Sequence, residues 1–320
     1  MVGLVTGPPA QGVRIGWEQV PEPVRAAIER VLGGRVIEAR TQPGGFSPGL
    51  AARARCENGG RFFIKAVSAQ ANPDSPGIHR QEARVLAALE PVVTARRLPV
   101  PRLFGVVEHA PWTALILEDI AGRQPAVPWL AAELALVVAA VDDLAEALTP
   151  SPIEAPTVAE VFGDDFTGWR TLAGSADHGG LDAWSRAHLD RLAAIEATWP
   201  EHAAGDTLLH CDIRADNLLI AGHRPVVVDW PWACRGAAFV DVALFAPSVA
   251  MQGGPQPAEL VALSRSGRAA GRADLTALVC GLAGFFTERS LRPPPPGLPT
   301  VRRFQAAQGT VARRWLADLI

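Results

Sequence analysis

A polar segment set between two short apolar runs constrains the fold of this chain most strongly. The sequence LLHCDIRADNLLI begins at Leu208, and VVVDW begins at Val226. A core strand has no use for the side chains of His210, Asp212 and Asn217, because each polar group buried without a partner costs about 1–3 kcal/mol. The pattern therefore predicts short strands joined by a loop whose polar side chains serve a function.

The spacing of three oxygen-bearing side chains indicates a metal site. Asp212 is followed by Asn217 five positions later and by Asp229 seventeen positions later. Carboxylate and amide oxygens, completed by phosphates and waters, suit Mg²⁺, which seldom occupies a site built from protein ligands alone. We expect strands at 218–220 and 226–228 to bring these side chains to one cleft.

Lysine usage singles out another position. The chain has 30 lysine and arginine residues, and Lys65 is the only lysine among them. A compact ammonium and a planar guanidinium are not interchangeable, so Lys65 is either a site that refuses arginine or a surface lysine present by chance. Its neighbours Phe63 and Ile64 are typical of a buried strand, which favours the first interpretation. Glu82, on a helix predicted over 78–89, is placed where it could pair with Lys65 or face solvent.

The order of predicted elements indicates an α+β fold with two lobes. Strands are predicted at 35–42, 50–56, 61–67, 102–108 and 113–119, with Asn58-Gly59 as a hairpin turn, and a helix precedes them at 21–32. From Pro128 onward the pattern is chiefly helical. We therefore predict a β-rich N-terminal lobe (1–117), a hinge (118–123) and a mainly helical C-terminal lobe (124–320), with a ligand cleft between the lobes.

Composition excludes several classes of protein. With 320 residues, 48% apolar and 20% charged, the chain is typical of soluble globular proteins, and a net charge of −3 gives no basic field for nucleic acid. The N-terminus does not read as a signal peptide, and the apolar stretch 130–148 carries four acids, so it predicts an amphipathic helix. Four scattered cysteines favour neither disulfides nor zinc, and we expect a cytoplasmic protein.

These motifs resemble the aminoglycoside phosphotransferase and choline kinase family, whose members are small-molecule kinases with a protein-kinase-like fold. HCDIRADN followed by VVVDW matches the family pattern His-x-Asp-x-x-x-x-Asn and a later metal-binding Asp. The resemblance implies ATP or GTP as co-substrate and Mg²⁺ as cofactor. It departs from the family at Cys211, where many members have glycine, and at Trp230-Pro231 after Asp229.

The resemblance also implies roles for individual residues. Asp212 would be the catalytic base, Asn217 and Asp229 would hold magnesium, and Lys65 with Glu82 would bind the α- and β-phosphates. The remaining assignments concern supporting positions, namely the backbone of Glu118 and Ile120 against adenine, Gly45 and Ser47 of the loop 44–49 near phosphate, and His210 and Asp241 bracing the catalytic loop. An ordinary tight turn remains an equal alternative for the glycine loop.

The acceptor is expected to be a small hydroxylated molecule. Only eleven residues separate Asp229 from Asp241, which leaves little platform for a peptide. An acidic segment (151–209) could attract a cationic acceptor such as an aminoglycoside, whereas the segment 230–320 is basic and a choline- or sugar-type metabolite stays open. Two other functions compete, a non-catalytic nucleotide-binding protein and a metal-dependent hydrolase with His210, Asp212 and Asp229 as ligands.

Overall fold

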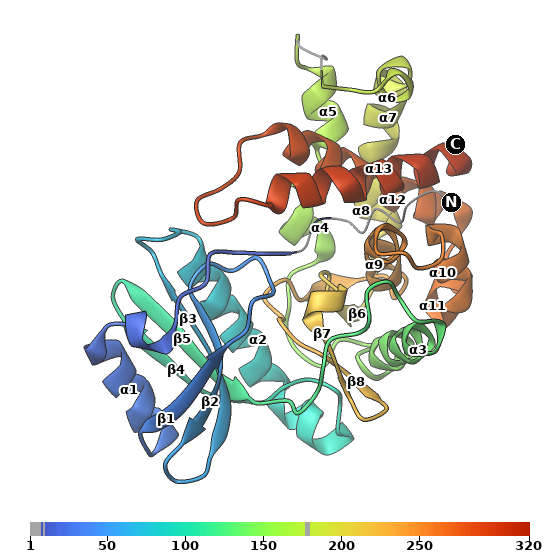
Figure 1. The fold of residues 1–320 in the computed structure, drawn as a ribbon. Helices are drawn as coiled ribbons and strands as arrows, with labels where there is room; N and C mark the ends of the chain where they lie inside the picture. Colours follow the sequence, from blue (N-terminus) through green and yellow to red (C-terminus); the bar gives the residue numbers. More distant parts are fainter. Residues whose placement is uncertain (1–7, 9, 177–179) are drawn as a thin grey trace.

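A five-stranded antiparallel sheet forms the N-terminal lobe. The computed structural model describes residues 8, 10–176 and 180–320. The strands are β1 (Val36–Thr41), β2 (Leu50–Cys56), β3 (Arg61–Ser68), β4 (Leu103–His109) and β5 (Trp112–Glu118), in the spatial order β1-β2-β3-β5-β4 (Figure 1). All five strands predicted from the sequence are confirmed. The lobe therefore presents one continuous sheet to the rest of the molecule.

The two faces of the sheet have different partners because side chains alternate along a strand. On β5, Ala114 and Ile116 pack in one cluster with α1 (Glu22–Leu32), while Leu115 and Leu117 pack in another with α2 (Ser75–Arg96). The short 3-10 helix η1 (Trp17–Gln19) adds to the α1 side. The predicted helix at 78–89 is thus part of a longer helix, which continues through Pro91.

This alternation decides where the lone lysine points. On β3, Ile64 and Ala66 are fully buried on the α1 side. Lys65 stands between them and therefore faces the opposite side, toward α2 and the C-terminal lobe. The sheet itself thus aims Lys65 into the interlobe space.

The C-terminal lobe is mainly helical, as predicted, and packs around buried aromatic side chains including Trp169, Trp199 and Phe245. Its helices are α3 (Ala131–Ala147), α4 (Val158–Phe162), α5 (Gly168–Ala173), α6 (Ala183–Ala187), α7 (Leu189–Glu196), α8 (Trp199–His202), α9 (Val240–Met251), α10 (Pro257–Leu263), α11 (Arg265–Ala269), α12 (Arg272–Leu291) and α13 (Val301–Leu319). None of the helices in the described part of the chain is long and apolar enough to span a membrane. The α+β fold with two lobes is confirmed, whereas the division at 117 and 123 stays a prediction.

Two small sheets frame the polar segment. β6 (Thr207–Leu209) pairs with β9 (Cys234–Gly236), and β7 (Leu218–Ala221) forms a hairpin with β8 (Arg224–Val227). The sequence predicted β7 and β8 but not the pairing of β6 with β9. A 3-10 turn, η2 (Ala215–Asn217), lies between β6 and β7. Residues 210–217 are therefore a loop held at both ends by strands.

Candidate active site

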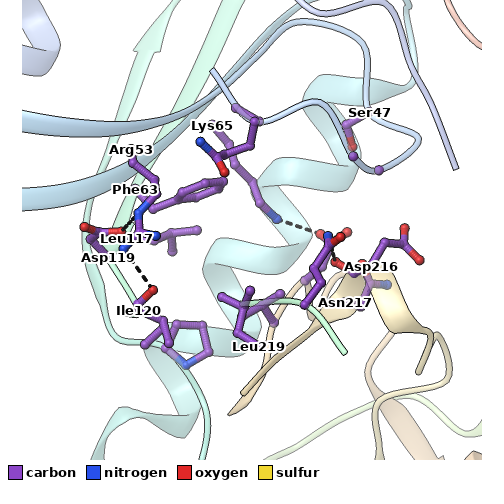
Figure 2. Close-up of a pocket in the computed structure, with 18 of the residues that line it drawn as sticks. Ser47, Arg53, Phe63, Lys65, Leu117, Asp119, Ile120, Asp216, Asn217 and Leu219 are labelled. Carbon is purple, nitrogen blue, oxygen red and sulfur yellow. Dashed lines mark hydrogen bonds and ion pairs between the residues drawn. The ribbon is translucent and has the colours of Figure 1, made fainter. Parts of the chain in front are cut away.

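A cavity of about 520 Å³ lies between the five-stranded sheet and the end of the loop 210–217. Its walls come from β2, β3, the glycine loop 44–49, α2, the segment 117–124 and the residues around β7 and β8. Figure 2 shows Phe63, Leu117 and Ile120 toward one end and Ser47, Asp216 and Asn217 toward the other. Lys65 lies between the two groups (Figure 2). The first end combines these apolar side chains with the Arg53–Asp119 ion pair, whereas the second is the polar end of the cavity, and Lys65 separates the two.

Lys65 is bound by two carboxylates. Its Nζ lies 2.8 Å from both carboxylate oxygens of Glu82 and 2.7 Å from Oδ1 of Asp229. Burial disfavours the charged lysine, but attraction to Asp229 and Glu82 outweighs it and raises the pKa of Lys65 to about 12. Burial likewise opposes ionisation of Asp229, yet Lys65 lowers the pKa of Asp229 to about 2. The predicted pairing of Lys65 with Glu82 is present, and the alternative of a solvent-facing Glu82 is wrong because this side chain is buried.

The loop places Asp212 between two polar side chains, Arg214 and Asn217. Arg214 donates to Asp212 Oδ1 at 2.6 Å, and Asn217 Nδ2 donates to Asp212 Oδ2 at 3.0 Å and to its carbonyl at 2.8 Å. Arg214 also binds Asp216 at 2.9 Å. Burial is the largest influence on Asp212 and, against the attraction of Arg214, raises the pKa of its carboxyl to about 7. A carboxyl poised near neutrality can accept a proton from a reacting group.

His210 and Asp241 fix the loop from behind. Asp241 accepts the N–H groups of His210 at 2.9 Å and Cys211 at 2.7 Å. Nδ1 of His210 accepts the Asp212 N–H at 3.1 Å, so Nε2, 3.0 Å from the Val228 carbonyl, carries the proton. Burial lowers the pKa of His210 to about 4, which keeps the ring neutral. Both ring nitrogens are therefore engaged in structural hydrogen bonds.

Cys211 and Asp229 both adopt a left-handed backbone, with φ of 63° and 71°. Residues other than glycine, asparagine and aspartate rarely adopt this region, so glycine, the residue that the resemblance gives many members here, would suit position 211 without strain. The thiol of Cys211 is buried against that of Cys234, with the sulfurs 3.3 Å apart. The predicted absence of disulfide-bonded cysteines agrees with four free cysteines.

The donor set fits a divalent cation that is completed by phosphates. The Nδ2 of Asn217 donates to Asp212, and its Oδ1 has no hydrogen-bond partner among the described residues. Asp229 uses Oδ1 for Lys65 and lines the same cavity. Within residues 8, 10–176 and 180–320, no three His, Cys, Asp or Glu side chains are grouped to hold a metal by themselves. Two hard oxygen ligands beside room for phosphate are what Mg²⁺ commonly uses.

The linker after β5 offers limited backbone contacts. The Glu118 N–H already donates to the Arg102 carbonyl at 2.9 Å and is not available to a ligand. The Ile120 carbonyl accepts from Gly122 at 2.8 Å and from Arg53 at 3.2 Å, whereas the Ile120 N–H has no partner in the described chain. The Ile120 N–H is thus a donor without a partner in the described chain at the positions expected to meet adenine.

The glycine loop is less open than the sequence suggested. The N–H of Gly45 donates to the Ala10 carbonyl at 3.1 Å, and that of Gly49 donates to the Val13 carbonyl at 2.9 Å. Ser47 does line the cavity. The anticipated backbone cradle is therefore partly occupied by the chain's own N-terminal segment, and phosphate contacts by Gly45 and Ser47 stay predictions.

Several residues in the cavity were missed by sequence reasoning. Phe63 lies two positions before Lys65 on the same strand face, a signal that strand alternation could have supplied. Arg53 binds the buried Asp119 at 2.6 Å, and His79, one helical turn before Glu82, points Nδ1 at the Ser75 carbonyl and leaves Nε2 buried without a partner. Arg14 also lines the cavity. Nothing in the local sequence marks Arg14 or His79, because tertiary packing brings them in.

The arrangement defines a class of protein. A strand lysine paired with a helix glutamate, opposed by an Asp-x-x-x-x-Asn loop and a second aspartate, is the construction of kinase-like phosphotransferases. The model of the Phosphotransferase enzyme family matches residues 53–277, which contain all of these side chains. The chain therefore belongs to the Phosphotransferase enzyme family. No curated protein sequence matches it.

Solved structures of similar fold cover most of the chain at low identity. An aminoglycoside-3'-phosphotransferase of type VIII aligns with a TM-score of 0.57 and 22% identity over 83% of this chain and 100% of its own. Choline kinase LicA from Streptococcus pneumoniae aligns with a TM-score of 0.59 and 13% identity over 91% and 98%. Amicoumacin kinase hAmiN, in complex with AMP-PNP, Ca²⁺ and Ami, aligns with a TM-score of 0.54 and 10% identity over 83% and 85%. These similarities establish the kinase-like fold.

Proposed function

We propose that this protein transfers the γ-phosphate of ATP or GTP, with Mg²⁺, to a hydroxyl group of a small molecule. One observation carries the proposal: Lys65, Glu82, Asp229 and Asn217 line a single cavity, and Asn217 holds the carboxylate of Asp212 directly behind it at 3.0 Å. Charge and positioning supply most of the catalysis in phosphoryl transfer, and this cavity provides both.

In this proposal each side chain has one task. Asp212 orients the acceptor hydroxyl and takes its proton while the hydroxyl oxygen bonds to the γ-phosphorus and the bridging β–γ oxygen leaves with the nucleoside diphosphate. Lys65, held by Glu82, binds the phosphates nearer the base. Asn217 and Asp229 would hold the magnesium, which neutralises phosphate charge when bound. His210 and Asp241 hold the loop and touch no reactant.

Two acceptor classes are open. The eleven residues between Asp229 and Asp241 include the short strand β9 and leave little platform for a peptide. We therefore propose a small hydroxylated acceptor, either an aminoglycoside or other antibiotic, or a choline- or sugar-type metabolite. The names of the three similar structures span aminoglycoside, choline and amicoumacin, which supports testing a broad panel. An antibiotic acceptor would imply a role in resistance.

The competing functions receive less support. A metal-dependent hydrolase would need His210 as a ligand, but both ring nitrogens of His210 are already hydrogen-bonded to the backbone. A non-catalytic nucleotide-binding protein would have no need of a carboxylate at Asp212 that Arg214 and Asn217 hold in place. We therefore favour catalysis.

The test is consumption of ATP and of GTP, with and without Mg²⁺, against a panel of hydroxylated antibiotics, choline-like alcohols and sugars. We expect acceptor-dependent release of nucleoside diphosphate with one class, and a phosphorylated product by mass spectrometry. Asp212→Asn is the inactive control, and Asp143→Asn, an exposed acid on α3, is its matched active control. Metal-dependent nucleotide binding without turnover on any acceptor would favour the non-catalytic alternative.

A further inference from the structure

The N-terminal segment 10–15, here named the strap, runs along the glycine loop. Gly12 N–H donates to the Gly45 carbonyl at 2.8 Å, and Ile15 N–H donates to the Gly49 carbonyl at 3.2 Å. In the other direction Gly45 and Gly49 donate to the strap, as described above. The strap thus pairs with the loop on both sides of Ser47 and uses two of the loop N–H groups.

The strap is also attached to the C-terminal lobe. Val13 N–H donates to the Gly297 carbonyl at 3.0 Å, and the Thr300 hydroxyl donates to the Gln11 carbonyl at 3.1 Å. In Figure 1 the connection between α12 and α13 projects toward the N-terminal lobe, where these contacts lie. Phe46 of the glycine loop packs edge-on against Phe304 of α13, with ring centroids 5.1 Å apart. The loop is therefore fixed from both lobes.

Arg14 of the strap reaches into the nucleotide cavity. Its guanidinium donates to the carbonyls of Gly44 and Ser47, beneath the glycine loop. A Cβ at Gly45 would lie 2.9 Å from Arg14 Nη2, and Gly45 has φ of 88°, so glycine suits this approach. The negative charges of Asp229 and Asp216 attract the Arg14 guanidinium across the cavity. Arg14 thus lies at the polar end, where the terminal phosphates belong in the proposed function.

One hydrogen-bond donor of Arg14 is unsatisfied. Nε is buried and has no partner among the described residues. Only four such atoms occur in the described chain, and two of them, Arg14 Nε and His79 Nε2, belong to side chains that line this cavity. Both atoms are enclosed by protein, so contact with a ligand falls to the rest of the Arg14 side chain, which lines the cavity.

We propose that Arg14 binds a phosphate group of the nucleotide. It replaces, as a hydrogen-bond donor to phosphate, the N–H groups of Gly45 and Gly49, which already donate to the strap. This inference rests on the proposed nucleotide-dependent function. A guanidinium offers five donors in a planar fork, so it can hold two loop carbonyls and still donate to a phosphate oxygen. Arg14 therefore positions the loop and supplies charge at the same point.

Arg14 lies outside the part of the chain that the family model matches. The family match spans residues 53–277, whereas the strap, the glycine loop and the 297–300 contact lie outside it. Arg14 is thus brought to the cavity by segments that the matched motif does not include.

The test distinguishes direct binding of phosphate by Arg14 from mere support of the glycine loop. It uses ligands that differ in the number of phosphate groups. Affinities of AMP and of AMP-PNP with Mg²⁺ are measured by calorimetry for wild type, Arg14→Ala, Arg14→Gln and the exposed control Arg35→Ala. Gln keeps amide donors for the loop carbonyls but removes the charge. We expect both Arg14 variants to bind AMP-PNP about 10- to 100-fold more weakly, the range of one hydrogen bond to a charged group, while AMP affinity stays within about twofold.

Each outcome decides the inference. A loss restricted to AMP-PNP in both variants, with Arg35→Ala unchanged, supports it. Equal losses for AMP and AMP-PNP would reduce Arg14 to a structural residue and overturn it. Variants that bind AMP-PNP as the wild type does would overturn it and leave the proposed function standing. If the wild-type protein binds neither nucleotide, both the inference and the proposed function are wrong.

Discussion

Lys65 and Asp229 are 164 positions apart in the chain and in direct contact, with Nζ 2.7 Å from Oδ1. This ion pair joins β3 of the N-terminal lobe to a residue two positions beyond the end of β8 in the C-terminal lobe. A metal–nucleotide complex would compete for both partners, because phosphates attract Lys65 and the metal attracts Asp229. Binding of nucleotide is therefore expected to rearrange contacts between the lobes.

Lys65→Arg should weaken nucleotide binding although the charge is kept. Lys65 is buried between two carboxylates, and a planar fork cannot reproduce three contacts made by one ammonium. We expect the rise in melting temperature caused by ATP with Mg²⁺ to shrink markedly, since stabilisation follows affinity. Arg84→Lys, an exposed change on α2, should keep the full rise. Normal binding and turnover by Lys65→Arg would show that lysine is dispensable there.

Asp229→Asn should remove most of the magnesium dependence of nucleotide binding. A neutral amide is a weaker ligand for Mg²⁺, while asparagine accepts the φ of 71° at this position, so the fold should survive. Titration of Mg²⁺ at fixed nucleotide measures the effect. Asn217→Ala should act in the same direction but more mildly. Unchanged metal affinity in Asp229→Asn would place the metal elsewhere.

Asp212→Asn should strongly lower turnover while nucleotide affinity stays nearly intact. A positioned base contributes about 10²–10⁴-fold, so kcat should fall by that factor, whereas the affinity for a non-hydrolysable nucleotide should stay within about twofold. The melting temperature should change little because the amide has the same shape and Asn217 and His210 still hold the loop. Collapse of nucleotide affinity would instead identify Asp212 as a metal ligand.

The pH dependence of turnover should report the Asp212–Arg214 pair. A base must be ionised, and burial raises the pKa of Asp212 to about 7, so kcat should fall as pH falls below about 7. Arg214 favours the ionised carboxylate, so Arg214→Gln should raise the pKa of Asp212 and move this acid limb to higher pH. Arg224→Gln, on β8, should leave the profile in place. If the acid limb of the kcat profile lies at the same pH in Arg214→Gln as in the wild type, the assignment of Asp212 as the base is contradicted.

Asp241→Asn should destabilise the catalytic loop. Two backbone N–H groups share this carboxylate, and an amide offers one acceptor oxygen and turns a donor toward the other N–H. A buried unsatisfied donor costs about 1–3 kcal/mol, which corresponds to a fall in melting temperature of roughly 2–10 °C. Differential scanning calorimetry beside Asp143→Asn, an exposed acid, gives the comparison. Equal melting temperatures in the two variants would mean that Asp241 does not brace the loop.

The sequence by itself determined the elements and the local motif. The apolar neighbours of Lys65 placed it on a buried strand, and the spacing around two predicted strands indicated a shared cleft, which Asn217 and Asp229 do line. Both predictions depend on the spacing of residues that are close in the chain or on the fixed period of a strand, and a sequence displays these directly. The resemblance carried by these motifs named the family correctly.

Only the tertiary structure decided how far the site extends and how its groups are charged. The strap meets the glycine loop and Gly297 through backbone hydrogen bonds, which no side-chain pattern reveals. The pKa of Asp212 depends on burial and on the position of Arg214, both set by packing of distant segments. Arg14 therefore reads as an ordinary surface arginine in the sequence and becomes a cavity residue because two lobes and the N-terminal segment close around it.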